Sequence, residues 1–115
     1  MSEVRKLGRE AESIAADYLV RHGYTIVTRN YHARSAEIDL VCMDGDTLVF
    51  VEVRSLSKVT IVSPEETVNP NKQRKLTEAA SHYLSEVVGK EIPVRFDVVT
   101  IVGRSVRHYK DAFRP

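Results

Sequence analysis

The sequence has a single cysteine, no long apolar run and almost no net charge, and each scarcity excludes a class of protein. Because Cys42 stands alone, the chain can form no internal disulfide and has no cysteine cluster for zinc. No apolar run approaches the roughly 18 residues of a membrane-spanning helix, and the amino terminus shows no apolar signal segment. We therefore expect a cytoplasmic protein that does not enter a membrane.

A formal net charge of +1 neither demands nor excludes nucleic-acid binding, and it counts mildly against a protein that binds nucleic acid through electrostatics alone. The composition, 43% hydrophobic and 29% charged residues, is typical of globular proteins. A chain of 115 residues is long enough to bury a core without disulfides or structural metals. We expect residues 1–115 to form one domain.

Two alternating apolar runs flank the dipeptide Asp44-Gly45 and predict a β-hairpin. If the turn closes on this dipeptide, Val41 pairs with Leu48, and one face of the hairpin is apolar throughout. That face carries Ile38, Leu40, Cys42, Val49, Val51 and Val53. At the open end, the opposite face carries three acids and one arginine, which are Glu37, Asp39, Glu52 and Arg54.

Apolar stripes predict one helix over residues 2–22 and another from Asn69-Pro70 to Gly89. Further strands are expected at residues 24–29, 94–102 and 107–109, with a polar loop at 30–35 and a brief strand or a loop within 55–67. This order predicts an α/β sandwich around a mixed sheet, with the second helix as the crossover between parallel strands.

The acids on the hairpin need compensation, because like charges opposite each other destabilise a sheet. A hard cation such as Mg²⁺ takes one or two carboxylates as ligands, and Asp39 and Glu52 are diagonal neighbours on one face. Arg54 can hold a phosphate or stabilise developing negative charge, but it cannot act as a base. A lattice of surface ion pairs is the structural alternative.

Helical phase adds two charged residues from outside the hairpin. Glu12 lies at the flank of the first apolar stripe, where it can hold a water bound to the cation. Lys72 lies one turn before Leu76, in line with the buried stripe of the second helix, and can supply a second positive charge. The alternatives are an ion pair with a nearby arginine for Glu12, and a side chain that extends into solvent for Lys72.

An acid, about a dozen residues and then Glu-x-basic resembles the PD-(D/E)XK motif of restriction-endonuclease-like nucleases. Here the motif is Glu37-Ile38-Asp39 followed by Glu52-Val53-Arg54. More closely, the chain resembles the YraN-type uncharacterised protein family along nearly its whole length. That resemblance rests on Gly8, Glu12, Gly23-Tyr24, Arg29-Asn30, Glu37-Ile38-Asp39-Leu40, Val49-Phe50-Val51-Glu52-Val53-Arg54, Lys72, Leu76, Arg95-Phe96-Asp97-Val98-Val99 and Lys110-Asp111-Ala112-Phe113.

The resemblance implies a restriction endonuclease-like, tRNA endonuclease-like three-layer sandwich, in which two main helices flank a central mixed β-sheet. It also implies similarity to archaeal Holliday junction resolvases. Matched by position, the resolvase-like metal ligands are Glu12, Asp39 and Glu52, with Mg²⁺ or Mn²⁺ as the cofactor. Glu37 belongs to the family pattern but is not a resolvase ligand, and Arg54 stands where the nuclease motif prefers lysine.

These residues leave two main functions open. The first is a Mg²⁺-dependent endonuclease of Holliday junction resolvase type, with Asp39, Glu52, Arg54 and Lys72 as catalytic residues. Its substrate would be DNA rather than RNA, and the dimeric state of resolvases implies a homodimer. The second is a nuclease-fold module that binds nucleic acid or a DNA-repair partner without cutting, which Arg54 favours. A structural interaction protein with surface ion pairs is the third alternative.

Overall fold

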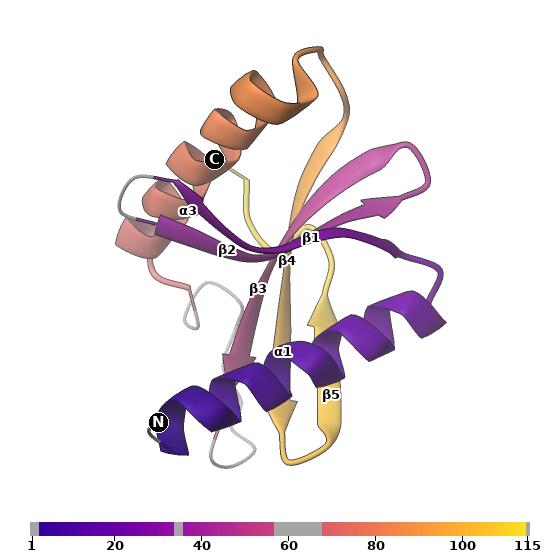
Figure 1. The fold of residues 1–115 in the computed structure, drawn as a ribbon, viewed down its shortest axis with the longest axis vertical. Coiled ribbons are helices and arrows are strands. Elements are labelled where there is room, and N and C mark those ends of the chain that lie inside the picture. Colours follow the sequence, from indigo (N-terminus) through magenta and orange to yellow (C-terminus); the bar gives the residue numbers. More distant parts are fainter. Residues whose placement is uncertain (1–2, 34–35, 57–67, 115) are drawn as a thin grey trace.

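The computed structural model describes residues 3–33, 36–56 and 68–114 (Figure 1). In chain order the elements are α1 (Glu3–Arg21), β1 (Thr25–Ala33), β2 (Ala36–Asp44), β3 (Thr47–Ser55), α3 (Pro70–Tyr83), η1 (Leu84–Val88), β4 (Val94–Val102) and β5 (Ser105–Tyr109). The strands form one sheet in the order β1-β2-β3-β4-β5, in which β3 and β4 are parallel and the other pairs are antiparallel. The predicted α/β class and mixed sheet are confirmed.

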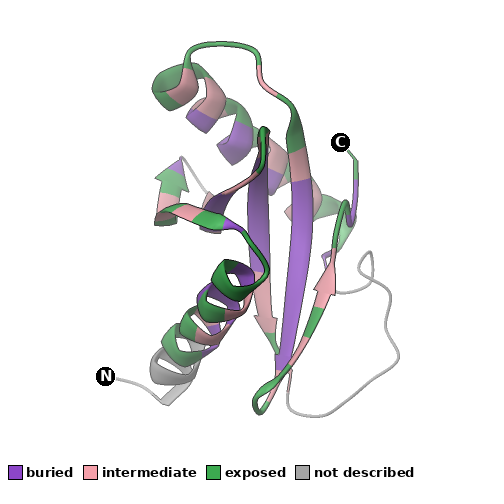
Figure 2. Cartoon of the chain, turned by 90° about the vertical axis from the view of Figure 1, so that its right-hand side faces the viewer, coloured by how far each residue is buried: buried purple, intermediate pink, exposed green. Residues whose placement is uncertain are grey.

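The two helices cover opposite faces of this sheet. Helix α3 packs on a cluster that includes Val41 and Phe50, whereas α1 packs on a cluster that includes Leu40 and Val51. Successive side chains of a strand point to opposite faces, and Leu40 and Val41 pack in different clusters. Each face of the sheet therefore has its own hydrophobic core. Helix, sheet and helix therefore make three layers, and burial is concentrated in the central strands (Figure 2).

Helix α3 makes the crossover between the parallel strands β3 and β4. Asn69 caps it by accepting a 2.9 Å hydrogen bond from the backbone N–H of Lys72, and Pro70 occupies the first turn. The helix continues as a π-helical turn, η1, and ends at Gly89 with φ 70°. The predicted start and end of this helix are confirmed. The strand or loop predicted for 55–67 lies, from residue 57 on, outside the described residues.

Two boundaries differ from prediction. Strand β1 runs on to Ala33 through the segment expected to be a loop, and β5 begins at Ser105 rather than Arg107. The β2–β3 register is also shifted by two residues, so that Val41 pairs with Phe50. The turn consists of Gly45 and Asp46, because Gly45 takes φ 60° as its first residue. A shift of two preserves the faces, since side chains alternate with period two.

The expectation that Ile38 shares a face with Leu40 is wrong. Leu40 packs in the α1 cluster, whereas Ile38 packs in the α3 cluster. Their partners on β1 are Arg29 and Tyr31, and between those two lies Asn30 with φ 54°. A left-handed residue breaks the two-residue period, so β1 and β2 exchange faces together at this point. Glu37 and Asp39 of β2 consequently group with Glu12 of α1, whereas Glu52, the one acid of β3, contacts Lys72 of α3.

A buried polar network connects β4 to the segment after α1 and to the C-terminal part of the chain. The carboxylate of Asp97 receives hydrogen bonds from Tyr24 Oη (3.1 Å), Arg95 Nε (2.8 Å) and the backbone N–H of Asp111 (3.0 Å). Nε2 of His108 lies 2.7 Å from the same carboxylate. Because a buried charge is costly unless it is paired, this network explains an aspartate in an apolar strand. In the described ranges no helix is long and apolar enough to cross a membrane.

A candidate metal centre where two strands separate

Three carboxylates from two elements converge beside the sheet. Glu12 projects from α1, and Glu37 and Asp39 project from β2; one oxygen of each lies within 4.8 Å of the others. All three side chains are partly buried. Their convergence is a consequence of the face exchange at Ile38, which turns the acids of β2 towards α1. Oxygen ligands at this spacing are the kind that hard divalent cations bind.

The backbone of β3 holds Asp39 in place. Strand pairing between β2 and β3 runs only as far as Leu40 and Val51. Beyond that pair, the N–H of Val53, two residues after Val51, donates to Oδ2 of Asp39 at 2.8 Å. A buried backbone N–H needs an acceptor. The Asp39 carboxylate is that acceptor here, in place of the backbone carbonyl that would accept the bond in regular strand pairing. The orientation of Asp39 is therefore fixed before any ligand binds.

The charges of this cluster are not fully compensated. Burial raises the pKa of Asp39 well above its ordinary value, and the charge of Glu52 and a hydrogen bond with that residue raise it further. Burial also raises the pKa of Glu12, as does the charge of Asp39. A raised carboxyl pKa shows that the ionised form lacks partners, and a divalent cation would supply the missing charge. The donor set therefore fits Mg²⁺ or Mn²⁺.

Glu52 lies on the other side of Asp39 and faces α3. It is 5% exposed, and its Oε2 lies 3.3 Å from Nε of Arg54 and 3.7 Å from Nζ of Lys72. The Arg54 contact is an ion pair without hydrogen-bond geometry. Glu52 thus stands between the carboxylates and two cationic side chains. The sequence-based placement of Lys72 at the mouth of α3, turned towards the hairpin, agrees with this contact.

The five residues expected at the site form one continuous set of contacts, but their grouping differs from expectation. Glu12 and Asp39 belong to the three converging carboxylates, and Glu37 is the third in place of Glu52. The hairpin pattern had Glu37 and Glu52 on one face, and that pattern held no sign of the face exchange. Asparagine at position 30 was the available signal, because asparagine is enriched at positive φ. Whether these residues bind a cation stays a prediction.

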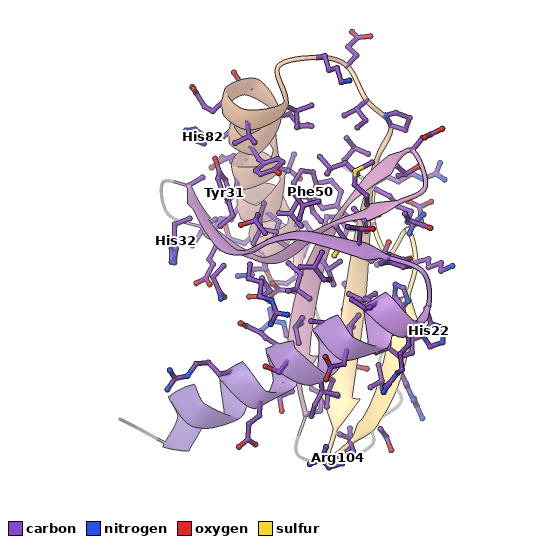
Figure 3. The ribbon with its side chains drawn as sticks, turned by 45° about the vertical axis from the view of Figure 1, so that its right-hand side comes forward. His22, Tyr31, His32, Phe50, His82 and Arg104 are labelled. Carbon is purple, nitrogen blue, oxygen red and sulfur yellow. The ribbon has the colours of Figure 1, made fainter. Side chains whose placement is uncertain are left out.

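Two short segments of the sequence, residues 31–34 and 104–110, are rich in basic side chains and have different surroundings. In the first, Tyr31 is engaged with α3, where its hydroxyl lies 2.6 Å from Nδ1 of His82 (Figure 3), while Arg34 lies outside the described residues. In the second, His108 is committed to the buried Asp97 network. The exposed basic side chains of that segment are Arg104, Arg107 and Lys110.

Residues 11–101 match the family described as "Uncharacterised protein family UPF0102". A UPF0102 protein of Anaeromyxobacter dehalogenans is 44% identical over 111 residues, which cover 93% of this chain and 83% of that protein. One from Thermodesulfovibrio yellowstonii is 40% identical over 108 residues, covering 94% and 96%. One from Chlorobium limicola is 38% identical over 117 residues, covering 93% and 91%. The resemblance to the uncharacterised YraN-type family is confirmed.

Proposed function

We propose that this chain, which belongs to the uncharacterised protein family UPF0102, is a Mg²⁺- or Mn²⁺-dependent endonuclease of Holliday junction resolvase type. One observation carries the proposal. Three carboxylates with room for a hard cation lie next to a glutamate that two cationic side chains contact. A cation at the phosphate and further positive charge both stabilise the anion that develops when a phosphodiester is hydrolysed.

The carboxylates of Glu12, Glu37 and Asp39 would hold the cation, and the Val53 N–H keeps Asp39 aimed at it. A divalent ion bound there supplies positive charge at the scissile phosphate. Glu52 contacts Arg54 and Lys72 on the α3 side, and its charge raises the pKa of Asp39. It therefore serves either as a further ligand or as the anchor that positions the two cationic side chains.

Arg54 and Lys72 are the groups that would bind the phosphate. Arg54 offers a planar fork of donors and is always charged, so it stabilises negative charge but takes no proton. Its Nε is buried and has only an ion-pair contact with Glu52, so a bond to a substrate oxygen would come from the other donors of the guanidinium, on a side chain that is 38% exposed. Lys72 supplies a point charge from the first turn of α3, where the helix dipole also favours an anion.

The substrate that we propose is structured DNA, in preference to RNA. Contacts to its backbone would come from exposed basic residues such as Arg104, Arg107 and Lys110, next to or within β5. A homodimer would place two such sites for paired cuts in a branched junction.

Cleavage of branched, single-stranded and duplex substrates tests the proposal in Mg²⁺ and in Mn²⁺. Wild type is expected to cut, and Asp39→Asn and Glu52→Gln are expected to reduce the rate by at least about a hundredfold. Glu10→Gln is the matched control, because it removes an exposed carboxylate two residues from Glu12 on the same helix. Cleavage that survives both site substitutions would come from a contaminant and would contradict the proposal.

A binding module that does not cut is the second candidate. The observation in its favour is that Glu52 already has Arg54 and Lys72 as ionic partners, with arginine where the nuclease motif prefers lysine. Titration with Mn²⁺ and with junction DNA separates the two functions. No uptake of Mn²⁺, together with salt-sensitive binding of DNA, would favour the binding module.

A further inference from the structure

We propose that Asn30 positions the carboxylates of the cation site and becomes an amide-oxygen ligand when the cation binds, a role that rests on the proposed metal-dependent function. Asn30 lies in β1, outside the acidic motif and the five residues expected at the site. Three observations support the role: its backbone conformation, its side-chain contacts and its exposure.

The backbone at Asn30 has φ 54°, in the left-handed region that asparagine and glycine adopt most readily. The face exchange occurs there, since the preceding pair Arg29–Leu40 and the following pair Tyr31–Ile38 point to different faces. Asn30 therefore lies at the kink that turns the β2 acids towards α1. The same backbone geometry places its side chain at the mouth of the cluster.

The side chain of Asn30 bridges two of the three acids. When the amide is oriented with its nitrogen towards the acids, that nitrogen lies 3.0 and 3.3 Å from the two oxygens of Glu12 and 2.7 Å from Oε1 of Glu37 and can donate to them. The nitrogen rather than the oxygen must face these groups in the metal-free protein, because carboxylates only accept hydrogen bonds. One neutral amide thus holds two like charges together, in the place where a cation would otherwise be needed.

The amide carries an oxygen and a nitrogen on the same carbon, so a half-turn about the last side-chain bond exchanges them. Asn30 is exposed, and no packing against the core opposes that turn. Hard cations accept asparagine carbonyl oxygens as ligands beside carboxylates. With the cation present, the turned amide would add a fourth oxygen to those of Glu12, Glu37 and Asp39.

Two substitutions that tolerate positive φ test this role. Asn30→Gly keeps the kink and removes the amide, whereas Asn30→Asp keeps an oxygen and adds a charge. Calorimetric titration with Mn²⁺ should show binding about tenfold weaker in Asn30→Gly and at least as tight as wild type in Asn30→Asp. In EDTA both variants should melt a few degrees lower, because the amide bridge is gone. A purely structural role predicts instead that both variants bind Mn²⁺ more weakly.

A double-mutant cycle in EDTA tests the bridge without any metal. Combining Asn30→Gly with Glu37→Gln should cost less stability than the sum of the two single substitutions, because both remove the same contact. Additive effects would overturn the bridge. Wild type that takes up no Mn²⁺ would overturn the metal-dependent function and the ligand role together. Wild-type uptake that Asn30→Gly leaves unchanged would overturn the role of Asn30 alone.

Discussion

The carboxylate of Asp39 accepts a 2.8 Å hydrogen bond from the backbone N–H of Val53, just beyond Leu40 and Val51, the last paired residues of β2 and β3. The bond gives the Val53 N–H an acceptor where strand pairing has ended. It also fixes the orientation of Asp39, whose negative charge is not fully compensated by nearby positive groups. Burial and the nearby charge of Glu52 raise the pKa of Asp39, because both disfavour its ionised form. Stability and cation binding should therefore respond in opposite ways to changes at this residue.

Asp39→Asn removes the charge and keeps an oxygen for the Val53 N–H. We expect the free energy of unfolding in EDTA to rise by about 1 kcal/mol, because one of several repelling carboxylates is gone. Mn²⁺ affinity should fall at least about tenfold, since a neutral amide is a weaker ligand for a hard cation. Urea unfolding and calorimetric titration measure the two quantities.

Glu10→Gln is the control for Asp39→Asn, because it alters the charge of α1 at an exposed position. It should leave both the Mn²⁺ affinity and the unfolding free energy within experimental scatter of wild type. If Asp39→Asn instead lowered stability and left Mn²⁺ binding intact, the acid cluster would be a structural ion-pair lattice.

Local chemistry made most of the fold predictable. The capping residue Asn69, Pro70 in the first turn and the terminal Gly89 each act through their own backbone preferences, so the limits of the second helix could be read directly. The hairpin was predictable in place but not in register, because Asp44-Gly45 and Gly45-Asp46 are both plausible turns. Strand pairing decided between them.

The candidate site was harder to predict because it depends on a break in the regular alternation of side chains along β2. Helical phase located Glu12 and Lys72 correctly, since both helices are regular where those residues lie. Alternation along β2 failed at Ile38, where the kink at Asn30 is transmitted across strand pairing to a residue eight positions away. The pattern of apolar and polar residues in one sequence does not reveal a kink that two paired strands share.

Arg54→Ala separates phosphate binding from cation binding. Because Arg54 contacts Glu52 and none of the three converging carboxylates in the described contacts, Mn²⁺ affinity should not weaken. The cleavage rate should fall about a hundredfold or more, as expected for loss of a group that stabilises developing charge. Single-turnover cleavage of a junction substrate and Mn²⁺ titration provide the comparison, and Arg54→Lys should retain part of the rate. Equal losses of rate and Mn²⁺ affinity would instead assign Arg54 to support of the acids.

Asp97→Asn should destabilise the fold without affecting the cation site. Its carboxylate accepts from Tyr24, Arg95 and the Asp111 N–H and contacts His108. An amide in its place offers one acceptor oxygen and turns an NH₂ group towards donors. We expect a loss of about 3 kcal/mol, typical of a buried charge network that loses one partner. Denaturant unfolding measures the loss, and Mn²⁺ affinity unchanged from wild type is the accompanying check.

The stability of the metal-free protein should pass through a maximum as the pH is lowered. Asp39 has a raised pKa in the folded state, so its charged form opposes folding. As the pH falls from the raised pKa of about 8 towards the ordinary value of 3.8, the folded state holds a proton that the unfolded state does not, and it gains stability. Melting temperatures recorded in EDTA from pH 7 to about pH 4 should therefore rise, and Asp39→Asn should flatten the rise.

Below that range the sign reverses because of Asp97. Burial alone would raise its pKa, but hydrogen bonds from His108 and Arg95 and from the Asp111 N–H outweigh it and lower the pKa to about 2. A depressed carboxyl pKa contributes stability that is complete above the ordinary value of 3.8 and is lost as the pH falls towards 2. The loss should amount to about 2 kcal/mol over this window. Melting temperatures between pH 4 and pH 2 test it, and Asp97→Asn should melt with a shallower acid limb than wild type. An equally steep limb in that variant would show that other carboxylates control acid unfolding.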